Sequence, residues 1–243
     1  MANNKMFVHW SSGKDASMAL HAAQQDPNWE IDRLLTTVNR SFGRVSMHGL
    51  RIDLLKAQAK AIGLPLDLVE LDANPSMEDY KHAMGEAFGG LRHAGYTHSL
   101  FGDIFLEDLR QYRIDMLAQH DLQCVFPLWK KDTHALLEDF IAAGFQAIVV
   151  CINAQLLPQS FCGRLIDTSF LQDLPAGVDP CGENGEFHTF CFDGPIFQQP
   201  IRFEKGEVVY KSYPAPQNVD QDGPDEYGFW YCDLLPASEA IDN

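Results

Sequence analysis

A short polar segment follows an apolar stretch near the start of the chain. Residues 5–10 are expected to form a strand, and from Asp15 onward an alanine-rich pattern predicts a helix. Between them lie Ser11, Ser12, Gly13 and Lys14. A tight turn from a strand into a helix directs several backbone N–H groups to one point, where the helix dipole and a lysine add positive charge. This corner suits a phosphate or pyrophosphate, although it lacks the spacing of a Walker A loop. The alternative is an ordinary turn in which a serine or Asp15 caps the helix.

A second group of reactive side chains lies at residues 179–190. Residues 181–188 alone contain a thiol, two carboxylates, an amide and an imidazole. Gly182 and Gly185 let the backbone bend tightly and approach a ligand. From residue 185 onward the residues alternate as in a strand, which places Glu186 and His188 on one face. The alternative is a glycine-rich turn into a hairpin with its corner at residues 184–185.

Helices and strands alternate in the part of the chain that carries the first group. Strands are expected at residues 31–38, 64–71, 98–101 and 123–126, and helices at 49–62, 77–92 and 106–120. Ser76 and Asp79 form a capping pair for the second of these helices. This alternation predicts an α/β fold, a parallel sheet with helices on both faces. Ligands bind beyond the carboxyl ends of such strands, so residues 11–14, 36–39 and 102–103 are expected to meet there.

The pattern changes after residue 126, where prolines and glycines become frequent. We predict two domains, residues 1–126 and a smaller α+β domain of residues 127–243. The second is expected to contain a helix at 132–143 and an apolar strand at 145–152. A hairpin at 203–213 with Lys205 and Gly206 in its turn, a mobile loop at 214–226 and a last strand at 227–235 should follow.

Composition excludes several classes of function. The formal net charge of −16 argues against nucleic-acid binding through a basic surface, but not against a nucleotide, which needs only a local cradle. No apolar run approaches the length of a membrane span, and residues 1–5 lack the apolar core of a signal peptide, so we expect a cytoplasmic protein. The six cysteines form no CxxC pair and are expected to be reduced and buried.

The two groups together resemble a known family. Residues 11–15 resemble the PP-loop of the ATP pyrophosphatase superfamily, SGGxDS. The segment DPCGENGEFHTF at 179–190 resembles the GEGGEFET signature of the diphthine–ammonia ligase family, in the form of its bacterial-type branch. Residues 102–104 (GDI) and 127–129 (PLW) also match, and the resemblance runs from about residue 6 to residue 200. The chain departs from the family pattern at Ser12, Ala16, Asn184 and His188.

The resemblance implies a fold and a reaction. It makes residues 1–126 a PP-loop ATP-binding domain with a Rossmann-like sheet of the HUP type, and residues 127–243 the substrate-binding domain. It implies a ligase that splits ATP into AMP and pyrophosphate, adenylates a carboxylate and lets ammonia displace AMP to form an amide. The implied partners are ATP, Mg²⁺, ammonia and a carboxylate on a small molecule or protein residue. A homodimer stays open.

The resemblance also implies roles for individual residues. Lys14 would contact the phosphates and Asp15 would hold a bridging Mg²⁺, which makes both of them catalytic candidates. Glu183 and Glu186, also catalytic candidates, would hold ammonium or take a proton from it, because only the neutral amine attacks. ATP contacts are expected from Ser11, Ser12, Gly13, Lys14, Asp15, Ser17, Thr37, His48, Gly102 and Asp103. Substrate contacts are expected from Asp103, Cys181, Gly182, Glu183, Asn184, Gly185, Glu186 and His188.

Simpler roles compete with several of these assignments. Asp103 would equally serve as the cap of the following helix, and Cys181 is better explained as a packed thiol than as a nucleophile. Arg110 and Arg113 are expected on a solvated helix face. For the whole chain, the alternative is an adenine-nucleotide-binding regulatory protein or a nucleotide hydrolase without ligase activity. A sulfur-transfer or tRNA-modifying relative would need a cysteine pair and a basic surface, which the sequence lacks.

Overall fold

Parallel strands form the first sheet of the computed structural model, which describes residues 4–45, 49–214 and 226–237. These strands follow the spatial order β4–β2–β1–β5–β6, and the short β3 pairs antiparallel with the end of β2. Their bounds are β1 (Asn4–His9), β2 (Trp29–Asn39), β3 (Arg44–Val45), β4 (Leu66–Leu71), β5 (His98–Leu100) and β6 (Gln123–Val125). Because β1, β2 and β5 are neighbours, the carboxyl ends that were expected to meet do lie at one edge of the sheet.

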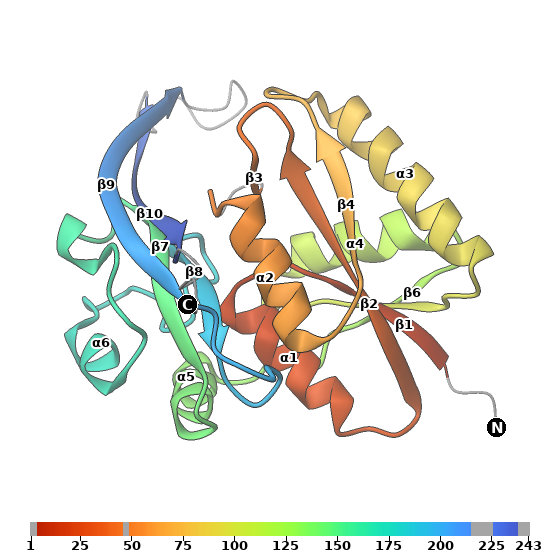
Figure 1. Ribbon diagram of the computed structural model, residues 1–243, viewed down its shortest axis with the longest axis horizontal. Coiled ribbons are helices and arrows are strands. Elements are labelled where there is room, and N and C mark those ends of the chain that lie inside the picture. The colour runs from red at the N-terminus through yellow and green to blue at the C-terminus, as the bar shows by residue number, and fades with distance from the viewer. Residues whose placement is uncertain (1–3, 46–48, 215–225, 238–243) are drawn as a thin grey trace, which may run out of the picture.

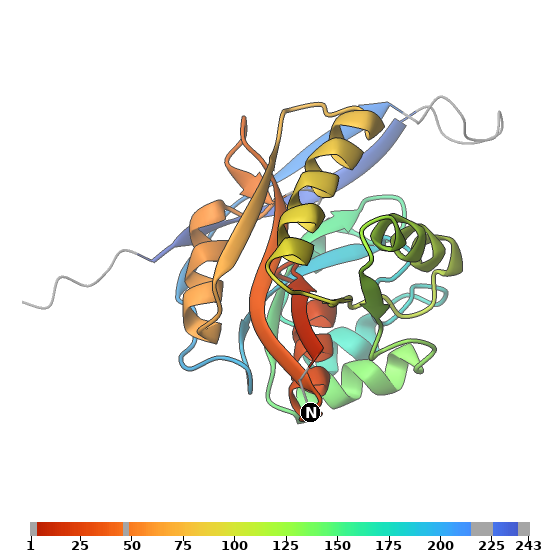
Figure 2. The ribbon, with the colours of Figure 1, turned by 90° about the vertical axis from the view of Figure 1, so that its right-hand side faces the viewer.

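Helices cover both faces of this sheet, as predicted (Figure 2). Alternate residues of β1 show the division. Met6 and Val8 belong to the core that includes α1 (Lys14–Gln24) and α2 (Ile52–Ile62). Phe7 belongs to the core beneath α3 (Met77–His93) and α4 (Glu107–Ala118). Period-two alternation therefore places apolar side chains on both sides of a fully covered strand. The predicted capping pair of Ser76 and Asp79 is present at the start of α3.

The second part of the chain forms an antiparallel sheet with the order β8–β7–β10–β9, which confirms the predicted α+β character. Its elements are α5 (Thr133–Ala142), β7 (Gln146–Asn153), the 3-10 helix η1 (Gln159–Phe161), α6 (Thr168–Asp173), β8 (Phe187–Asp193), β9 (Phe203–Pro214) and β10 (Glu226–Pro236). In Figure 1, α1 and α2 lie between the two sheets. One hydrophobic core accordingly includes Leu20 of α1 and Phe190 of β8. The domain boundary near residue 127 stays a prediction.

Two predicted elements are wrong in detail. The helix expected from residue 49 begins at Ile52. Val45 N–H donates to Leu50 O, so Leu50 belongs to a turn that precedes the helix. The hairpin expected at residues 203–213 is the single strand β9, paired along its length with β10. Its register shifts where Gly206 lies beside Asp233, so the glycine marks a bulge and not a turn.

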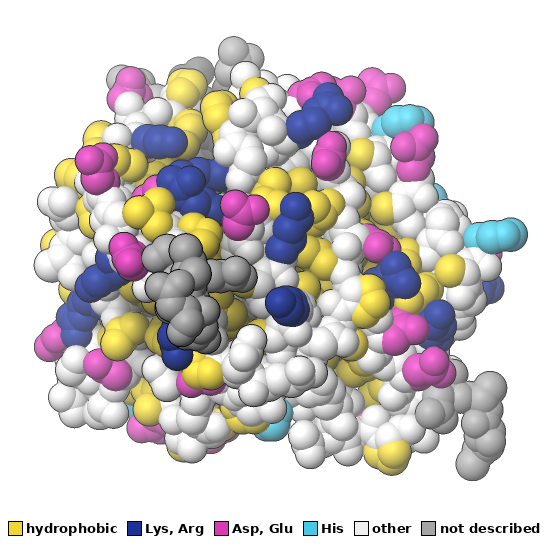
Figure 3. All heavy atoms as spheres, viewed as in Figure 1, with side chains coloured by type: hydrophobic (Ala, Val, Ile, Leu, Met, Phe, Trp, Pro, Cys, Tyr) yellow, Lys and Arg dark blue, Asp and Glu magenta, His cyan; other side chains and the backbone are white. Residues whose placement is uncertain are grey.

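Charges are interspersed on the face shown in Figure 3, where basic side chains lie among acidic ones and form no continuous basic surface. All six cysteines are free thiols; five are buried and Cys124 is half-buried. Among the described helices, none has the length and apolarity that crossing a membrane requires. Most of the loop predicted at 214–226, namely residues 215–225, lies outside the described residues.

Candidate functional site

The predicted anion-binding loop connects β1 to α1. Ser12 adopts a left-handed backbone (φ 73°), and Gly13 is the N-cap of α1 without a side-chain capping bond. The side-chain cap by serine or Asp15 that the alternative expected is therefore wrong, and anion binding by this loop stays a prediction. Ser11 Oγ accepts a hydrogen bond from Gly13 N–H at 3.3 Å. Ser17 Oγ donates to Gly13 O at 2.9 Å, so its hydroxyl is engaged inside the helix.

Lys14 is buried, with only 2% of its side chain exposed. Its Nζ lies 2.7 and 2.9 Å from the two carboxylate oxygens of Asp15, and it also donates to Cys181 O. Burial has the largest effect on the pKa of Lys14 and lowers it, but Asp15, Cys181 and Glu183 together outweigh burial and raise the pKa overall. Lys14 therefore stays an ammonium that is held between the loop and the segment at 179–190.

The segment at 179–190 folds into a compact loop before β8. Asp179 accepts hydrogen bonds from the backbone N–H groups of Cys181 (3.2 Å) and Glu183 (2.9 Å). Gly182 and Gly185 have left-handed φ values of 71° and 85°, and a Cβ on Gly182 would lie 2.9 Å from Phe187 O. Both glycines are therefore needed for the bend. The segment leads into a strand without forming the hairpin that was the alternative.

Glu186 serves this loop and is 2% exposed. Its Oε1 accepts from Asp179 N–H at 3.0 Å and from Asn184 Nδ2 at 3.1 Å, whereas its buried Oε2 has no hydrogen-bond partner among the described residues. Glu186 therefore stabilises the loop through Oε1, and its Oε2 can still accept a hydrogen bond. Asn184, which is a candidate for substrate binding, is exposed apart from this bond to Glu186.

Three segments that are far apart in the sequence meet at this point. Lys14 N–H donates to Thr189 Oγ1 at 3.0 Å, and Glu183 Oε1 accepts from Ile104 N–H (2.7 Å) and Phe105 N–H (3.3 Å). The loop at 11–15, the loop after β5 and the segment at 179–190 thus share direct hydrogen bonds. The structure brings together most of the residues that the sequence singled out.

The titratable side chains of this cluster have distinct states. Burial raises the pKa of Glu183 to about 7, against the lowering effect of its bond from Ile104 N–H. Burial and the nearby Lys14 lower the pKa of His188 to about 4, so its imidazole is neutral. Burial raises the pKa of Cys181 to about 12, and its thiol contacts Thr133 O at 3.3 Å. Cys181 is therefore a packed thiol, whereas Glu183 can exchange a proton near neutral pH.

Gly102 and Asp103 join the loop after β5 to the start of α1. A Cβ on Gly102 would lie 2.8 Å from Ala16 N, so only glycine permits this approach. Asp103 is 6% exposed, and its Oδ1 accepts from Arg113 Nε at 2.9 Å. The N-cap of α4 is Leu106, so the alternative role of Asp103 as a helix cap is wrong.

The expectation of a solvated face for Arg110 and Arg113 is also wrong. Both side chains are half-buried. Arg113 pairs with Asp103 and stacks over Phe101, with Cζ 4.6 Å from the ring centroid. Arg110 Cζ lies 5.3 Å from the ring centroid of Phe126 and 4.9 Å from that of Trp129. The helix buries this side because aromatic residues follow both β5 and β6.

Gln58 of α2 is a site residue that sequence reasoning missed. It is fully buried and accepts from Trp10 Nε1 at 2.7 Å. Its Nε2 donates to Ser12 O at 2.9 Å and to Cys191 O at 2.6 Å, which fastens the loop to β8. The available signal was a polar residue four positions after Leu54, on the apolar face of the helix.

A second missed feature joins β10 to the start of α2. Asp233 Oδ1 accepts from Arg44 Nη1 at 2.8 Å, and its Oδ2 accepts from Arg51 Nη2 at 2.6 Å. Burial alone would raise the pKa of Asp233, but the bonds from Arg51 and Arg44 outweigh it and lower the pKa to about 2. Of the nucleotide candidates on this side, Thr37 is half-buried on β2, and His48 lies outside the described residues.

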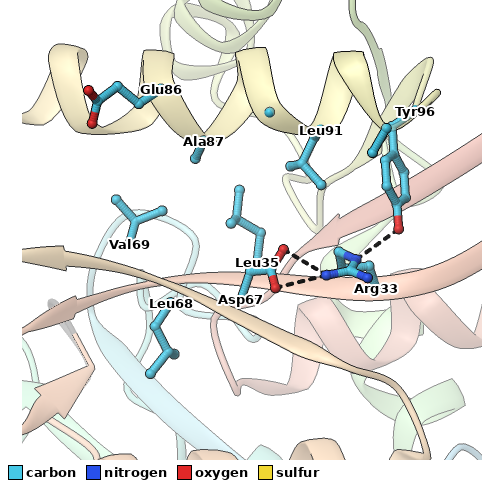
Figure 4. A pocket seen from close by; sticks show the side chains of 11 residues that line it. Arg33, Leu35, Asp67, Leu68, Val69, Glu86, Ala87, Leu91 and Tyr96 are labelled. Carbon is cyan, nitrogen blue, oxygen red and sulfur yellow. Dashed lines mark hydrogen bonds and ion pairs between the residues drawn. The ribbon is translucent and has the colours of Figure 1, made fainter.

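A hollow of about 340 Å³ between α3 and the strands β2 and β4 is a separate feature (Figure 4). Apolar side chains such as Leu35, Val69 and Leu91 line most of it. Its arginine, Arg33, already donates to both oxygens of Asp67 and to the Tyr96 hydroxyl. None of the candidate site residues lines this hollow, so it is not part of the site.

The donor set was compared with what Mg²⁺ requires. The described residues contain no group of three His, Cys, Asp or Glu side chains arranged to hold a metal. Asp15, the predicted ligand, has both oxygens on Lys14. Mg²⁺ in nucleotide sites is commonly held by one or two carboxylates together with phosphate oxygens. A single carboxylate therefore fits a Mg²⁺ that is held mainly by the phosphates of ATP, and Asp15 as that ligand stays a prediction.

Comparisons with known proteins identify the family of the chain. The family model of the diphthamide synthase N-terminal domain matches residues 4–121, and that of the diphthamide synthase C-terminal domain matches residues 132–216. A diphthine–ammonia ligase from Danio rerio is 28% identical over 68% of this chain and 69% of its own length. Those from Bos taurus and Homo sapiens are 33% and 32% identical over 45% of this chain and 43% of theirs. The chain thus matches less than half the length of these two mammalian relatives.

A solved structure, described as a predicted subunit of a tRNA methyltransferase from Methanocaldococcus jannaschii, has a TM-score of 0.36 at 14% identity. It covers 62% of this chain and 78% of its own, and so weak a likeness adds nothing to the assignment.

The fold defines an α/β protein that has, at the carboxyl edge of its parallel sheet, a loop from a strand into a helix. The two family models show which family of such proteins the chain belongs to. The chain belongs to the diphthamide synthase family, whose curated relatives are diphthine–ammonia ligases.

Proposed function

We propose that the chain is an ATP-dependent ligase that joins ammonia to a carboxylate and releases AMP and pyrophosphate. The observation that carries this proposal is the direct contact between the loop at 11–15 and the segment at 179–190, through Lys14 and Cys181 O. A phosphate cradle and a cluster of carboxyl groups within one site are what such a reaction needs. The α-phosphorus must be attacked by a carboxylate, and ammonium must lose a proton before it attacks the activated acyl group.

The chain's own residues would divide this work. The backbone of Ser12 and Gly13, with the positive end of α1, would receive the phosphates. The Lys14 ammonium would neutralise charge on the leaving pyrophosphate. Asp15 would hold a Mg²⁺, which would supply Lewis-acid stabilisation. Glu183 would accept the proton from ammonium, since the pKa of its carboxyl is raised to about 7.

The segment at 179–190 would bind the acyl substrate. Its departures from the family pattern, exposed Asn184 and half-buried His188, lie in this segment, so they bear on which carboxylate is bound. The relatives named diphthine–ammonia ligase act on diphthine by name. We extend to this chain the class of reaction, with a small carboxylate or a protein residue as its substrate. The bacterial-type form of the motif favours a substrate other than diphthine.

The test is an ATP–pyrophosphate exchange screen of the purified full chain with Mg²⁺ and pools of carboxylates, followed by assay of AMP formation when ammonium chloride is added. We expect exchange to depend on a carboxylate and AMP to depend on ammonium. Lys14→Ala should abolish exchange, whereas the matched variant Lys60→Ala, on the exposed side of α2, should not. Release of ADP, or unchanged exchange in Lys14→Ala, would refute the proposal.

One observation favours the alternative of an adenine-nucleotide-binding regulatory protein. Lys14 is enclosed by Asp15 and Cys181 O, so it must leave these partners before it can contact a phosphate. A regulatory protein would bind ATP and form no AMP with any mixture of carboxylate and ammonium, and the same screen separates the two.

A further inference from the structure

Arg110 on α4 is a cation that forms no ion pair with an acidic side chain of the described residues. Its guanidinium is held against the rings of Phe126 and Trp129, at 5.3 and 4.9 Å from Cζ to the ring centroids. Its Nε is buried and has no hydrogen-bond partner among the described residues. The side chain as a whole is half-buried. The rings thus hold the side chain in place, and the two terminal nitrogens of the guanidinium can donate hydrogen bonds to a ligand.

The other half-buried arginines of the described structure differ from it. Each forms an ion pair with an aspartate at 2.6 to 2.9 Å, and this holds for Arg33, Arg44, Arg51, Arg113 and Arg164. The glutamate one turn before Arg110, Glu107, is paired with Lys130 instead, at 2.9 Å. Partial burial of an unpaired charge is unfavourable, so a counter-ion supplied from outside the chain would stabilise it.

The place of Arg110 in the fold indicates where that counter-ion comes from. Phe101 follows β5 and Phe126 follows β6; their rings stack at 5.5 Å, and His9 at the end of β1 stacks on Phe101 at 5.1 Å. This aromatic wall lies at the carboxyl edge of the parallel sheet, where ligands of such folds bind. The adjoining backbone is that of the site, because Lys130 N–H donates to Ile104 O and Ile104 N–H donates to Glu183.

The other cations of the site already have acidic partners. Lys14 is engaged by Asp15, and Arg113 is engaged by Asp103. Glu183 adds negative charge as it titrates near pH 7. The positive charges near this edge are therefore already paired with aspartates. A triphosphate or a carboxylate that enters it would be stabilised by a cation that is not paired.

We propose that Arg110 binds an oxyanion group of a substrate, through the outer edge of its guanidinium. The oxyanion is a phosphate of the nucleotide or the carboxylate of the acyl substrate. The identity of these two ligands rests on the proposed function, but the anion site itself does not. Arginine binds both groups in the same planar, bidentate geometry. A lysine supplies only a point charge.

The test observes the Nε–H signals of isotope-labelled arginines by NMR in the full chain, with the Arg110 signal assigned from its loss in Arg110→Lys. The probes are Mg-ATP, inorganic pyrophosphate and succinate, each compared with sodium chloride at equal ionic strength. Arg164 is the matched control, because it also stacks on two rings, of Phe161 and Phe170, but is neutralised by Asp173. We expect at least one probe to shift Arg110 beyond the chloride effect and to leave Arg164 unchanged.

The probes separate the two sources. A response to pyrophosphate and Mg-ATP identifies a phosphate site, and a response to succinate alone identifies a carboxylate site. Titration calorimetry of the responding probe should then show affinity reduced about 10-fold or more in Arg110→Gln and less in Arg110→Lys. The proposal is overturned if no probe shifts Arg110 beyond chloride, or if Arg110→Gln binds the probe as the native chain does. Neither readout depends on turnover, so absent AMP formation would refute the ligase and leave this test standing.

Discussion

Replacement of Gln58 by leucine tests whether this residue holds the phosphate loop. Gln58 is fully buried, and its amide joins three partners: Trp10 on the loop side, Ser12 in the loop and Cys191 on β8. Leucine has a similar volume, so it fills the space without supplying a donor or an acceptor. The variant therefore removes the hydrogen bonds and leaves the packing nearly intact.

The magnitude follows from the groups that lose their partners. Trp10 Nε1 loses its acceptor and Cys191 O loses the amide donor, whereas Ser12 O keeps its bond from Cys191 N–H at 3.0 Å. Each unsatisfied buried group costs about 1–3 kcal/mol, and the buried leucine offsets part of the sum. We expect Gln58→Leu to lower the free energy of unfolding by about 3 kcal/mol. For a chain of this size that corresponds to a fall of roughly 6–12 °C in Tm.

The assay is urea unfolding followed by tryptophan fluorescence, analysed by linear extrapolation. Gln111→Leu is the matched control, because Gln111 is exposed on α4 and bonds only to Asp115 among the described side chains. It should change the free energy of unfolding by less than about 0.5 kcal/mol. If Gln58→Leu costs less than about 1 kcal/mol, the network does not stabilise the fold. If it destabilises the fold but leaves the Kd for Mg-ATP unchanged, Gln58 does not position the loop.

Four further predictions concern Gly102, Ser12, Asp233 and Glu183. Gly102→Ala should lower the free energy of unfolding by about 1–3 kcal/mol, since its Cβ meets backbone, whereas Gly89→Ala, which meets open space on α3, should be neutral or raise it by up to about 1 kcal/mol, both by urea titration. The free energy of unfolding of Ser12→Gly should exceed that of Ser12→Ala by about 1 kcal/mol, because both variants remove the buried hydroxyl and only glycine adopts the left-handed φ without strain. Equal stability of the two variants would contradict backbone strain at Ser12. The pKa of Asp233 is lowered in the folded state, so its roughly 2 kcal/mol of stability should be present above pH 4 and lost as the pH falls toward 2, and Asp233→Asn should flatten that part of the stability profile. Glu183→Gln should slow AMP formation about 100-fold and remove the rise in rate through pH 7 that titration of the carboxylate gives the native chain; an unchanged profile would exclude Glu183 as the proton acceptor.

The parts of the fold that sequence predicted are those set by local patterns. The strands of the first sheet, the capping pair of α3 and the glycines of the segment at 179–190 each depend on neighbours within a few residues. Gly206 shows where such reasoning ends. A lysine–glycine pair suits a turn or a bulge equally. The pair forms a bulge because Gly206 lies beside Asp233 on another strand. No local pattern carries that information.

The site was predictable to the same extent. The two groups of reactive residues were found because each is contiguous, and the strand-end rule brought Gly102 and Asp103 to them. Gln58 and Arg110 were missed or misjudged, because their roles depend on what faces them in three dimensions. Gln58 meets the indole of Trp10, and Arg110 meets rings that follow different strands. A polar residue on the apolar face of a predicted helix is the one local signal that would have selected Gln58.

The departures of the loop from the PP-loop pattern have a structural explanation. Ser12 stands where the pattern has glycine, yet it takes the left-handed φ that glycine would take, with its carbonyl fixed by Gln58 and Cys191. Ala16 stands where the pattern has its last serine; it is 4% exposed, and its backbone N lies against Gly102. Ser17, one residue later, directs its hydroxyl to Gly13 O and not away from the helix. Gly13 is the N-cap of α1, so the chain still turns from a strand into a helix at this point. We therefore expect the loop to bind an anion through its main chain, without the hydroxyl contact of the last serine of the pattern.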